Sequence, residues 1–186
     1  MKTKIEEFTC NQCHATLLEI SLMKNLYVCS YCGHHLPMPA YARILNLVDE
    51  GSFKGRQWEK VSKNPLAFPN YEQKLELNRK KTGLQDALVW GTGKMGKEKI
   101  VIAVLDSRFL MGSMGTVVGE KLVTAIEYAT TKRLPLLIFS SSGGARMQEG
   151  LFSLMQMAKT SGAIAQFQEV GGLYISCLTN PTTGGV

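Results

Sequence analysis

Short apolar runs and helical segments alternate along the second half of the chain. Apolar runs over 87–90, 100–105, 134–139 and 173–178 predict strands, and the segments 117–131 and 147–170 are expected to be helices. Alternation of this kind is typical of an α/β domain with buried parallel strands. We therefore look for chemistry at the ends of the strands.

The first half of the chain has a different pattern. Pro39 begins a short predicted helix. A second predicted helix covers 71–81, with Leu75 and Leu77 directed inward, and it ends at Gly83. We divide the chain into a cysteine-rich ribbon at 1–38, a helical connector at 39–83 and the α/β domain at 84–186.

Four of the five cysteines form the pattern Cys-x2-Cys-x15-Cys-x2-Cys near the start of the chain. Each pair can form a tight knuckle that directs two thiolates at one tetrahedral zinc ion. Two disulfides are the alternative, which a reducing cytosol and the lack of a signal peptide disfavour. We expect Gly33 in a turn with positive φ after the second knuckle, and 26–28 as a short strand leading into it. The expected ligands of this filled, structural site are Cys10, Cys13, Cys29 and Cys32.

The positions of the histidines limit the chemistry of the α/β domain. All three histidines, His14, His34 and His35, lie beside the knuckles, where four thiolates already fill the zinc site. The serines at 140–142 follow a predicted strand, but that domain has no histidine to activate a serine. A Ser-His-Asp triad is therefore not expected, and Cys177, in an apolar run, is given no role.

The segment 91–96 matches the dinucleotide-binding pattern Gly-x-Gly-x-x-Gly letter for letter. A pyrophosphate site needs a helix after the last glycine, whereas 99–104 is an apolar run typical of a strand. We interpret the glycines as part of a β-hairpin.

Two Gly-Gly pairs, Gly143-Gly144 and Gly184-Gly185, follow predicted strands. Paired glycines at such positions can present backbone N–H groups to a carbonyl oxygen and form an oxyanion hole. A single pair is more typical of a tight turn, and the repetition at successive strand ends leaves both interpretations open.

Charge and hydropathy narrow the class of protein. The formal net charge of +6 is spread along the chain, so it does not predict a phosphate-binding patch. No stretch approaches the roughly 18 continuous apolar residues of a membrane helix. We expect a cytoplasmic protein that does not enter the membrane.

Several long motifs resemble the β subunit of bacterial acetyl-CoA carboxylase carboxyltransferase, from about residue 9 to the last residue. These motifs are the four-cysteine ribbon and the segments 112–115, 118–121, 142–150, 153–161 and 181–186. The resemblance implies an α/β fold in which a four-cysteine zinc ribbon precedes an incomplete crotonase-like ββα spiral. It implies a transferase that moves a carboxyl group from carboxybiotin to acetyl-CoA and gives malonyl-CoA for fatty acid biosynthesis.

The resemblance also implies partners. They are a carboxyltransferase α subunit in an α2β2 assembly, a biotin carboxyl carrier protein and the biotin carboxylase of the ATP-binding complex. No Met-Lys-Met acceptor sequence surrounds any lysine, so biotin is expected to arrive on the carrier. In this family the biotin nitrogen takes the acetyl proton and the enolate attacks CO2, so no side-chain nucleophile is implied.

The enolate and the biotin ureido oxygen each need an oxyanion hole, and the α subunit is expected to supply one of them. The resemblance assigns the other hole to Gly184 and Gly185, and the lining of the acyl-CoA site to Gly143 and Gly144. Arg146 and Gly115 are expected to line the acyl-CoA or biotin site, with Arg146 and Glu149 holding the active-site helix.

Family members continue past the Thr-Thr-Gly-Gly-Val run, so we expect this chain to be inactive alone and to expose apolar surface. Two other classes stay open. One is a zinc ribbon that binds nucleic acid, although the nearly balanced charge of 1–38 argues against it. The other is a structural partner whose active site lies on another subunit.

Overall fold

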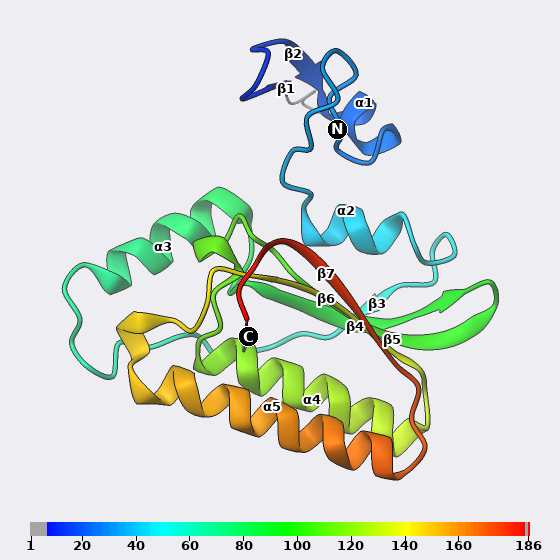
Figure 1. Ribbon diagram of the computed structural model, residues 1–186, viewed down its shortest axis with the longest axis vertical. Helices are drawn as coiled ribbons and strands as arrows, with labels where there is room; N and C mark the ends of the chain where they lie inside the picture. The colour runs from blue at the N-terminus through cyan, green and yellow to red at the C-terminus, as the bar shows by residue number, and fades with distance from the viewer. Residues whose placement is uncertain (1–6, 185) are drawn as a thin grey trace.

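The computed structural model describes residues 7–184 and 186, which form a small N-terminal module and a larger α/β body (Figure 1). The body contains a five-stranded sheet in the order β3-β4-β5-β6-β7. β3 and β4, and β4 and β5, pair antiparallel, whereas β5, β6 and β7 run parallel. The strands are β3 (Lys54–Gly55), β4 (Leu88–Met95), β5 (Glu98–Leu105), β6 (Leu136–Ser142) and β7 (Tyr174–Thr182).

Two long helices, α4 (Thr116–Lys132) and α5 (Leu151–Glu169), pack against each other on one face of the sheet (Figure 1). The short helix α2 (Ala40–Leu45) lies on the opposite face and packs on β4 and β5. Helix α3 (Tyr71–Thr82) lies beside the segment that follows β5. The core fills the space between β5 and α4, where 101–104 and Ile126 are fully buried.

The N-terminal module has its own small apolar cluster. It consists of β1 (Glu7–Thr9), β2 (Thr16–Leu18), which pair antiparallel, and α1 (Glu19–Lys24). Its buried residues include Leu17, Leu22 and Tyr27, and Ala42 of α2 packs against them. This contact attaches the module to the side of the sheet that α2 covers (Figure 1).

The predicted strands and helices of the body are confirmed, with different limits. The helix expected over 147–170 begins at Leu151, because a 3-10 turn at Met147–Glu149 and a φ of +54° at Gly150 precede it. The prediction that Leu77 faces inward is wrong, since its side chain is 65% exposed. Tyr71 and Leu75, one helical turn apart, form the buried side of α3 instead.

The strand expected at 26–28 is also wrong. Leu26 and Tyr27 have φ values of +51° and +61°, far from a strand. They form the turn that ends α1, in which the Leu26 N–H donates to the Met23 carbonyl and the Tyr27 N–H to the Leu22 carbonyl. Satisfying these helix-end carbonyls explains the left-handed backbone.

The β-hairpin expected at the glycine-rich segment 91–96 is confirmed. Met95 pairs with Glu98, and the turn consists of Gly96 and Lys97, both with positive φ. Gly91 lies within β4, where a Cβ would come within 2.4 Å of the Lys54 carbonyl oxygen. This glycine therefore allows β3 to pair closely with β4.

Apolar side chains are exposed along α5 and the strand that follows it. Leu151, Phe152 and Met155 are more than half exposed, and so is Leu178 on β7, which lies at the edge of the sheet. The expected exposure of apolar surface is thus confirmed. Among the described residues, no helix combines the length and the hydropathy needed to cross a membrane.

Candidate functional site

Backbone hydrogen bonds hold the turn after β6 against the segment that follows β5. The Gly143 N–H donates to the Met111 carbonyl at 2.9 Å, and the Met114 N–H donates to the Gly144 carbonyl at 3.0 Å. The Gly144 N–H donates to Ser142 Oγ at 3.0 Å, and a φ of +116° at Gly144 favours glycine there. Both glycine N–H groups of this turn therefore already have protein acceptors.

The chain after β7 lies against the same turn. The N–H and the hydroxyl of Thr183 each donate to the Ser142 carbonyl at 3.0 Å. A Cβ on Gly144 would lie 3.9 Å from Thr183 Cγ2, so the two glycine segments meet at one end of the parallel strands. Gly184 is exposed, and a Cβ on it would meet no atom within 4 Å. The other residue assigned to this hole, Gly185, lies outside the described residues.

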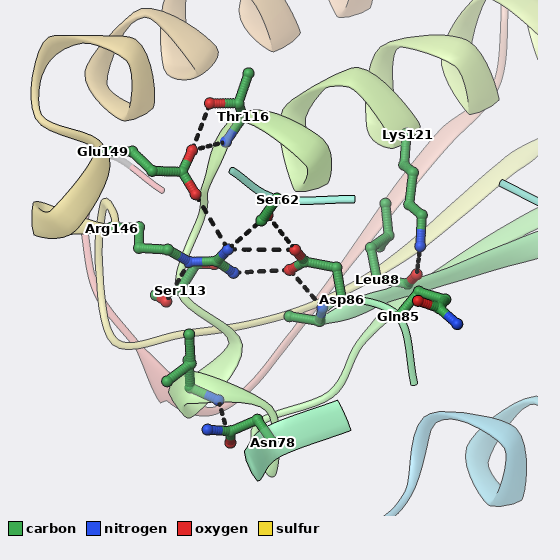
Figure 2. A network of polar contacts seen from close by, with 12 residues as sticks. Ser62, Asn78, Gln85, Asp86, Leu88, Ser113, Thr116, Lys121, Arg146 and Glu149 are labelled. Carbon is green, nitrogen blue, oxygen red and sulfur yellow. Dashed lines mark hydrogen bonds and ion pairs between the residues drawn. The ribbon is translucent and has the colours of Figure 1, made fainter. Parts of the chain in front are cut away.

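Arg146 follows the turn after β6, and its side chain is only 1% exposed (Figure 2). Its Nη2 lies 2.7 Å from Asp86 Oδ1 and 3.0 Å from the Ser113 carbonyl oxygen. Its Nη1 lies 3.1 Å from Ser62 Oγ and 3.3 Å from Glu149 Oε1. One guanidinium thus connects the segments around Ser62, Asp86 and Ser113 with its own segment, 146–149.

Glu149 connects this network to the start of α4. Its Oε2 accepts the Thr116 N–H at 2.6 Å and also the Thr116 hydroxyl, and its Oε1 accepts the Tyr71 hydroxyl at 2.5 Å. A carboxylate at this position satisfies a free N–H of the helix terminus and interacts favourably with the helix dipole. A Cβ on Gly115 would lie 2.6 Å from Glu149 Oε1 and 2.7 Å from Arg146 Nη1. Gly115 therefore provides the space that this network occupies.

The charges in the network stabilise one another. Burial opposes charge on Arg146, yet Asp86 raises the Arg146 pKa above its ordinary value. Burial alone would raise the pKa of Asp86, but the charge and hydrogen bonds of Arg146, with the Ser62 hydroxyl, hold it below its ordinary value. Burial raises the pKa of Tyr71, which remains a neutral donor to Glu149. These properties suit a fixed scaffold rather than a proton-transfer group.

The four cysteines of the predicted metal site lie together. Their Sγ atoms are all within 4.8 Å of one another. Cys10 and Cys32, and Cys13 and Cys29, have Sγ–Sγ distances of 3.7 Å. A tetrahedral ion with metal–sulfur bonds of about 2.3 Å has sulfur atoms about 3.8 Å apart. The four thiols therefore fit a single metal ion.

The two knuckles that carry these cysteines share a backbone hydrogen bond. The His14 N–H donates to the Cys10 carbonyl, and the Gly33 N–H donates to the Cys29 carbonyl, each at 2.9 Å. The positive φ expected at Gly33 is confirmed at +73°, and His14 has an equivalent φ of +59° that the sequence did not predict.

Sequence reasoning missed four residues of the network around Arg146 and Glu149: Ser62, Tyr71, Asp86 and Thr116. The only signal for Asp86 was its place directly before the apolar run 87–90, where a carboxylate would be buried and need a partner. Nothing in the sequence near Ser62 or Tyr71 indicated a contact with Arg146.

Known proteins share this architecture. Transcarboxylase 12S, solved with hydrolysed methylmalonyl-coenzyme A bound, is 28% identical with a TM-score of 0.59 over 71% of this chain and 24% of that chain. A Pseudomonas malonate decarboxylase hetero-tetramer in complex with malonate is 26% identical with a TM-score of 0.55, over 80% of this chain and 52% of that chain. A single-chain, multi-domain long-chain acyl-CoA carboxylase is 26% identical with a TM-score of 0.59, over 75% of this chain and 14% of that chain.

The chain spans about a quarter of the transcarboxylase chain and about half of the malonate decarboxylase chain. The carboxyl transferase domain family matches residues 40–186, which include the sheet, its helices and both glycine turns. Because this match covers most of the sequence, the chain belongs to the carboxyl transferase domain family.

Proposed function

We propose that this chain is the β-subunit part of an acetyl-CoA carboxylase carboxyltransferase, which transfers a carboxyl group from carboxybiotin to acetyl-CoA and forms malonyl-CoA. The observation that carries the proposal is the meeting of the turns at 142–144 and 183–184 at the carboxyl end of the parallel strands. Ligands of open α/β sheets bind at such ends. We infer the class of reaction, carboxyl transfer, from membership of the carboxyl transferase domain family. We infer acetyl-CoA as the substrate from the sequence resemblance to acetyl-CoA carboxylase β subunits.

The two glycine turns have different roles in this proposal. Gly184 is exposed with open space beside it, so its N–H and that of Gly185 are our candidates for one oxyanion hole. The N–H groups of Gly143 and Gly144 already donate to the Met111 carbonyl and to Ser142 Oγ. We therefore assign these two glycines to the wall that lines the acyl-CoA site. Carboxybiotin supplies the carboxyl group and, after its loss, a basic nitrogen.

Arg146 is proposed to position the turn rather than to contact substrate. Its guanidinium is buried and bonded to Asp86, Ser113 and Glu149, which leaves little of it accessible to a ligand. Gly115 contributes in the same way, by leaving room for the guanidinium and the Glu149 carboxylate. The network thereby fixes the turn after β6 relative to the start of α4.

We propose that the four-cysteine site holds one structural Zn²⁺, since four thiolates fill a tetrahedral site and leave no position for water or substrate. We further propose that a carboxyltransferase α subunit and a biotin carboxyl carrier protein work with this chain in the cytoplasm. The exposed apolar side chains of α5 and β7 support association with another polypeptide.

The test is turnover by this chain assembled with an α subunit, supplied with carboxybiotin and with acetyl-CoA, propionyl-CoA or a long-chain acyl-CoA. We expect malonyl-CoA formation with the highest kcat/KM for acetyl-CoA, and none from this chain alone. A higher kcat/KM for another acyl-CoA would contradict the substrate. Failure to carboxylate any acyl-CoA would contradict the reaction itself.

A further inference from the structure

A cavity of about 680 Å³ lies between the N-terminal module and the carboxyl ends of the parallel strands. Each of these strands contributes a residue near its carboxyl end: Leu105 in β5, Ser141 in β6 and Pro181 in β7. Another wall consists of α2 and the segment 35–38, which connects the module to α2 (Figure 1). The cavity thus lies at the end of the sheet where open α/β folds bind ligands.

This cavity is next to the two glycine turns. Ser141 directly precedes the turn at 142–144. Pro181 is two residues before Thr183, whose N–H and hydroxyl donate to the Ser142 carbonyl. A substrate whose reacting group lies at the glycine turns therefore has this cavity beside it.

Arg43 of α2 is a cation in the wall of the cavity, and it has free hydrogen-bond donors. Its side chain is partly buried, and the guanidinium lies over the Phe139 ring, 5.2 Å from the ring centroid. Among the described residues Arg43 has no hydrogen-bond acceptor and no ion pair, although a guanidinium has five N–H donors. Its donors are therefore available to a ligand.

The carboxylate whose charge acts on Arg43 is already occupied by other groups. Asp106 is fully buried, and its carboxylate forms an ion pair with Arg108 at 2.8 Å. The same carboxylate accepts the Ala40 N–H at 2.9 Å. Asp106 therefore does not replace an anionic ligand as the partner of Arg43.

The rest of the lining indicates which kind of anion fits. No carboxylate is among the described residues that line the cavity, and its other basic side chain, His35, is exposed. Asn46 and Asn180 add neutral amides, whereas Leu36 and Met38 add apolar surface. An unpaired guanidinium with amides and apolar side chains fits an anionic group on an arm of alkyl and amide groups.

From this arrangement we infer that the cavity holds the phosphate-bearing pantetheine arm of the coenzyme A moiety, and that Arg43 donates hydrogen bonds to its phosphate. The inference rests on the proposed function, which puts the thioester at the glycine turns and the remainder of the coenzyme beside them. Arg43 is then a binding residue for the substrate. The segment 35–38 makes the N-terminal module part of the wall around the coenzyme.

Two ligands that differ only in the phosphate test this inference. Phosphopantetheine and pantetheine have the same arm of alkyl and amide groups, and calorimetric titration of the 186-residue chain measures the affinity of each. We expect phosphopantetheine to bind more tightly by about tenfold or more, because it alone can accept charge-assisted hydrogen bonds from Arg43. Equal affinities, or no binding of phosphopantetheine, would overturn the inference.

Substitutions at Arg43 locate the phosphate. Arg43→Met should remove the preference for phosphopantetheine, whereas Arg43→Lys, which keeps the charge, should retain part of it. Arg133→Met, at the exposed end of α4, is the control and should keep the full preference. Far-UV circular dichroism verifies that each variant folds. If Arg43→Met does not fold, a full preference in Arg43→Gln would overturn the assignment, as it would in Arg43→Met.

Turnover in the complex with an α subunit separates this inference from the proposed function. Arg43→Met should raise KM for acetyl-CoA by about tenfold or more and change kcat little, because the phosphate is remote from the reacting carbon. Turnover with an unchanged KM would overturn the role of Arg43 and leave the proposed function intact. Arg43-dependent binding of phosphopantetheine in a complex that carboxylates no acyl-CoA would support the cavity assignment and contradict the proposed function.

Discussion

The Arg146 guanidinium lies 2.7 Å from the Asp86 carboxylate, and both side chains are at most 1% exposed. Removal of one partner leaves a buried charge without compensation. We therefore expect Asp86→Ala to lower the free energy of unfolding by about 3–5 kcal/mol. Urea denaturation followed by circular dichroism measures this loss.

The matched control for Asp86→Ala is Glu76→Ala on α3. Glu76 is 55% exposed and lies 3.6 Å from Lys80, so its loss should cost no more than about 1 kcal/mol. Equal effects of the two substitutions would show that the Arg146–Asp86 pair contributes no more than a surface pair.

The pH dependence of stability should also depend on Asp86. Because its folded-state pKa lies below the ordinary value of about 3.9, Asp86 stabilises the fold fully above that pH and loses its contribution as the pH falls further. The difference in unfolding free energy between the wild type and Asp86→Asn should therefore be constant near pH 7. It should decrease below about pH 4, where Asp86 becomes protonated first in the unfolded chain. A difference that stays the same from pH 7 to pH 3 would contradict the pKa direction.

Two glycine substitutions should have opposite effects. In Gly115→Ala the new methyl group would collide with Glu149 Oε1 and Arg146 Nη1, so we expect a loss of about 1–3 kcal/mol. In Gly162→Ala, on α5, the methyl group would meet no atom within 4 Å, and we expect a gain of up to about 1 kcal/mol. Thermal unfolding of both variants is the measurement. Equal tolerance of the two substitutions would mean that the network readily rearranges around Gly115.

The sequence predicted the alternating elements of the body because each depends on local information. The run 100–105 is buried in the middle of the sheet, and Gly83 ends α3 with a φ of +70°. The turn at Leu26 and Tyr27 was missed because non-glycine residues adopt positive φ there, stabilised by the end of α1. Leu77 was misplaced because the helical pattern of 71–81 does not show which side of α3 faces the body.

The candidate site was predictable where its residues are neighbours in the sequence. The cysteine spacing predicted four clustered thiols, and the strand pattern correctly placed each Gly-Gly pair directly after a strand. The Arg146 network was not predictable, because Asp86 is 60 positions from Arg146 and Ser62 is 84. Contacts of that kind depend on how the segments that carry Ser62 and Asp86 pack against the side chain of Arg146.

The four-cysteine site gives a direct test of metal content. We expect one zinc ion per chain, and Cys13→Ser should lose it, whereas Cys177→Ser, in β7, should retain it. Elemental analysis of the purified proteins measures the zinc content. The small apolar cluster of the N-terminal module should also lose order when a chelator removes the ion. Full zinc retention by Cys13→Ser would contradict the ligand set.

Gly184→Val, tested in the complex with an α subunit, separates a catalytic role of the last glycine turn from a structural one. A Cβ on Gly184 meets no atom within 4 Å, so the substitution should leave the free energy of unfolding nearly unchanged. If the N–H groups of this turn stabilise an oxyanion, the added side chain blocks its approach and kcat should fall by about 100-fold or more, since one such donor contributes about 3 kcal/mol. Thr131→Val, on the exposed end of α4, is the control and should keep full turnover. Normal kcat in Gly184→Val would place the oxyanion hole elsewhere and would favour a purely structural role for this turn.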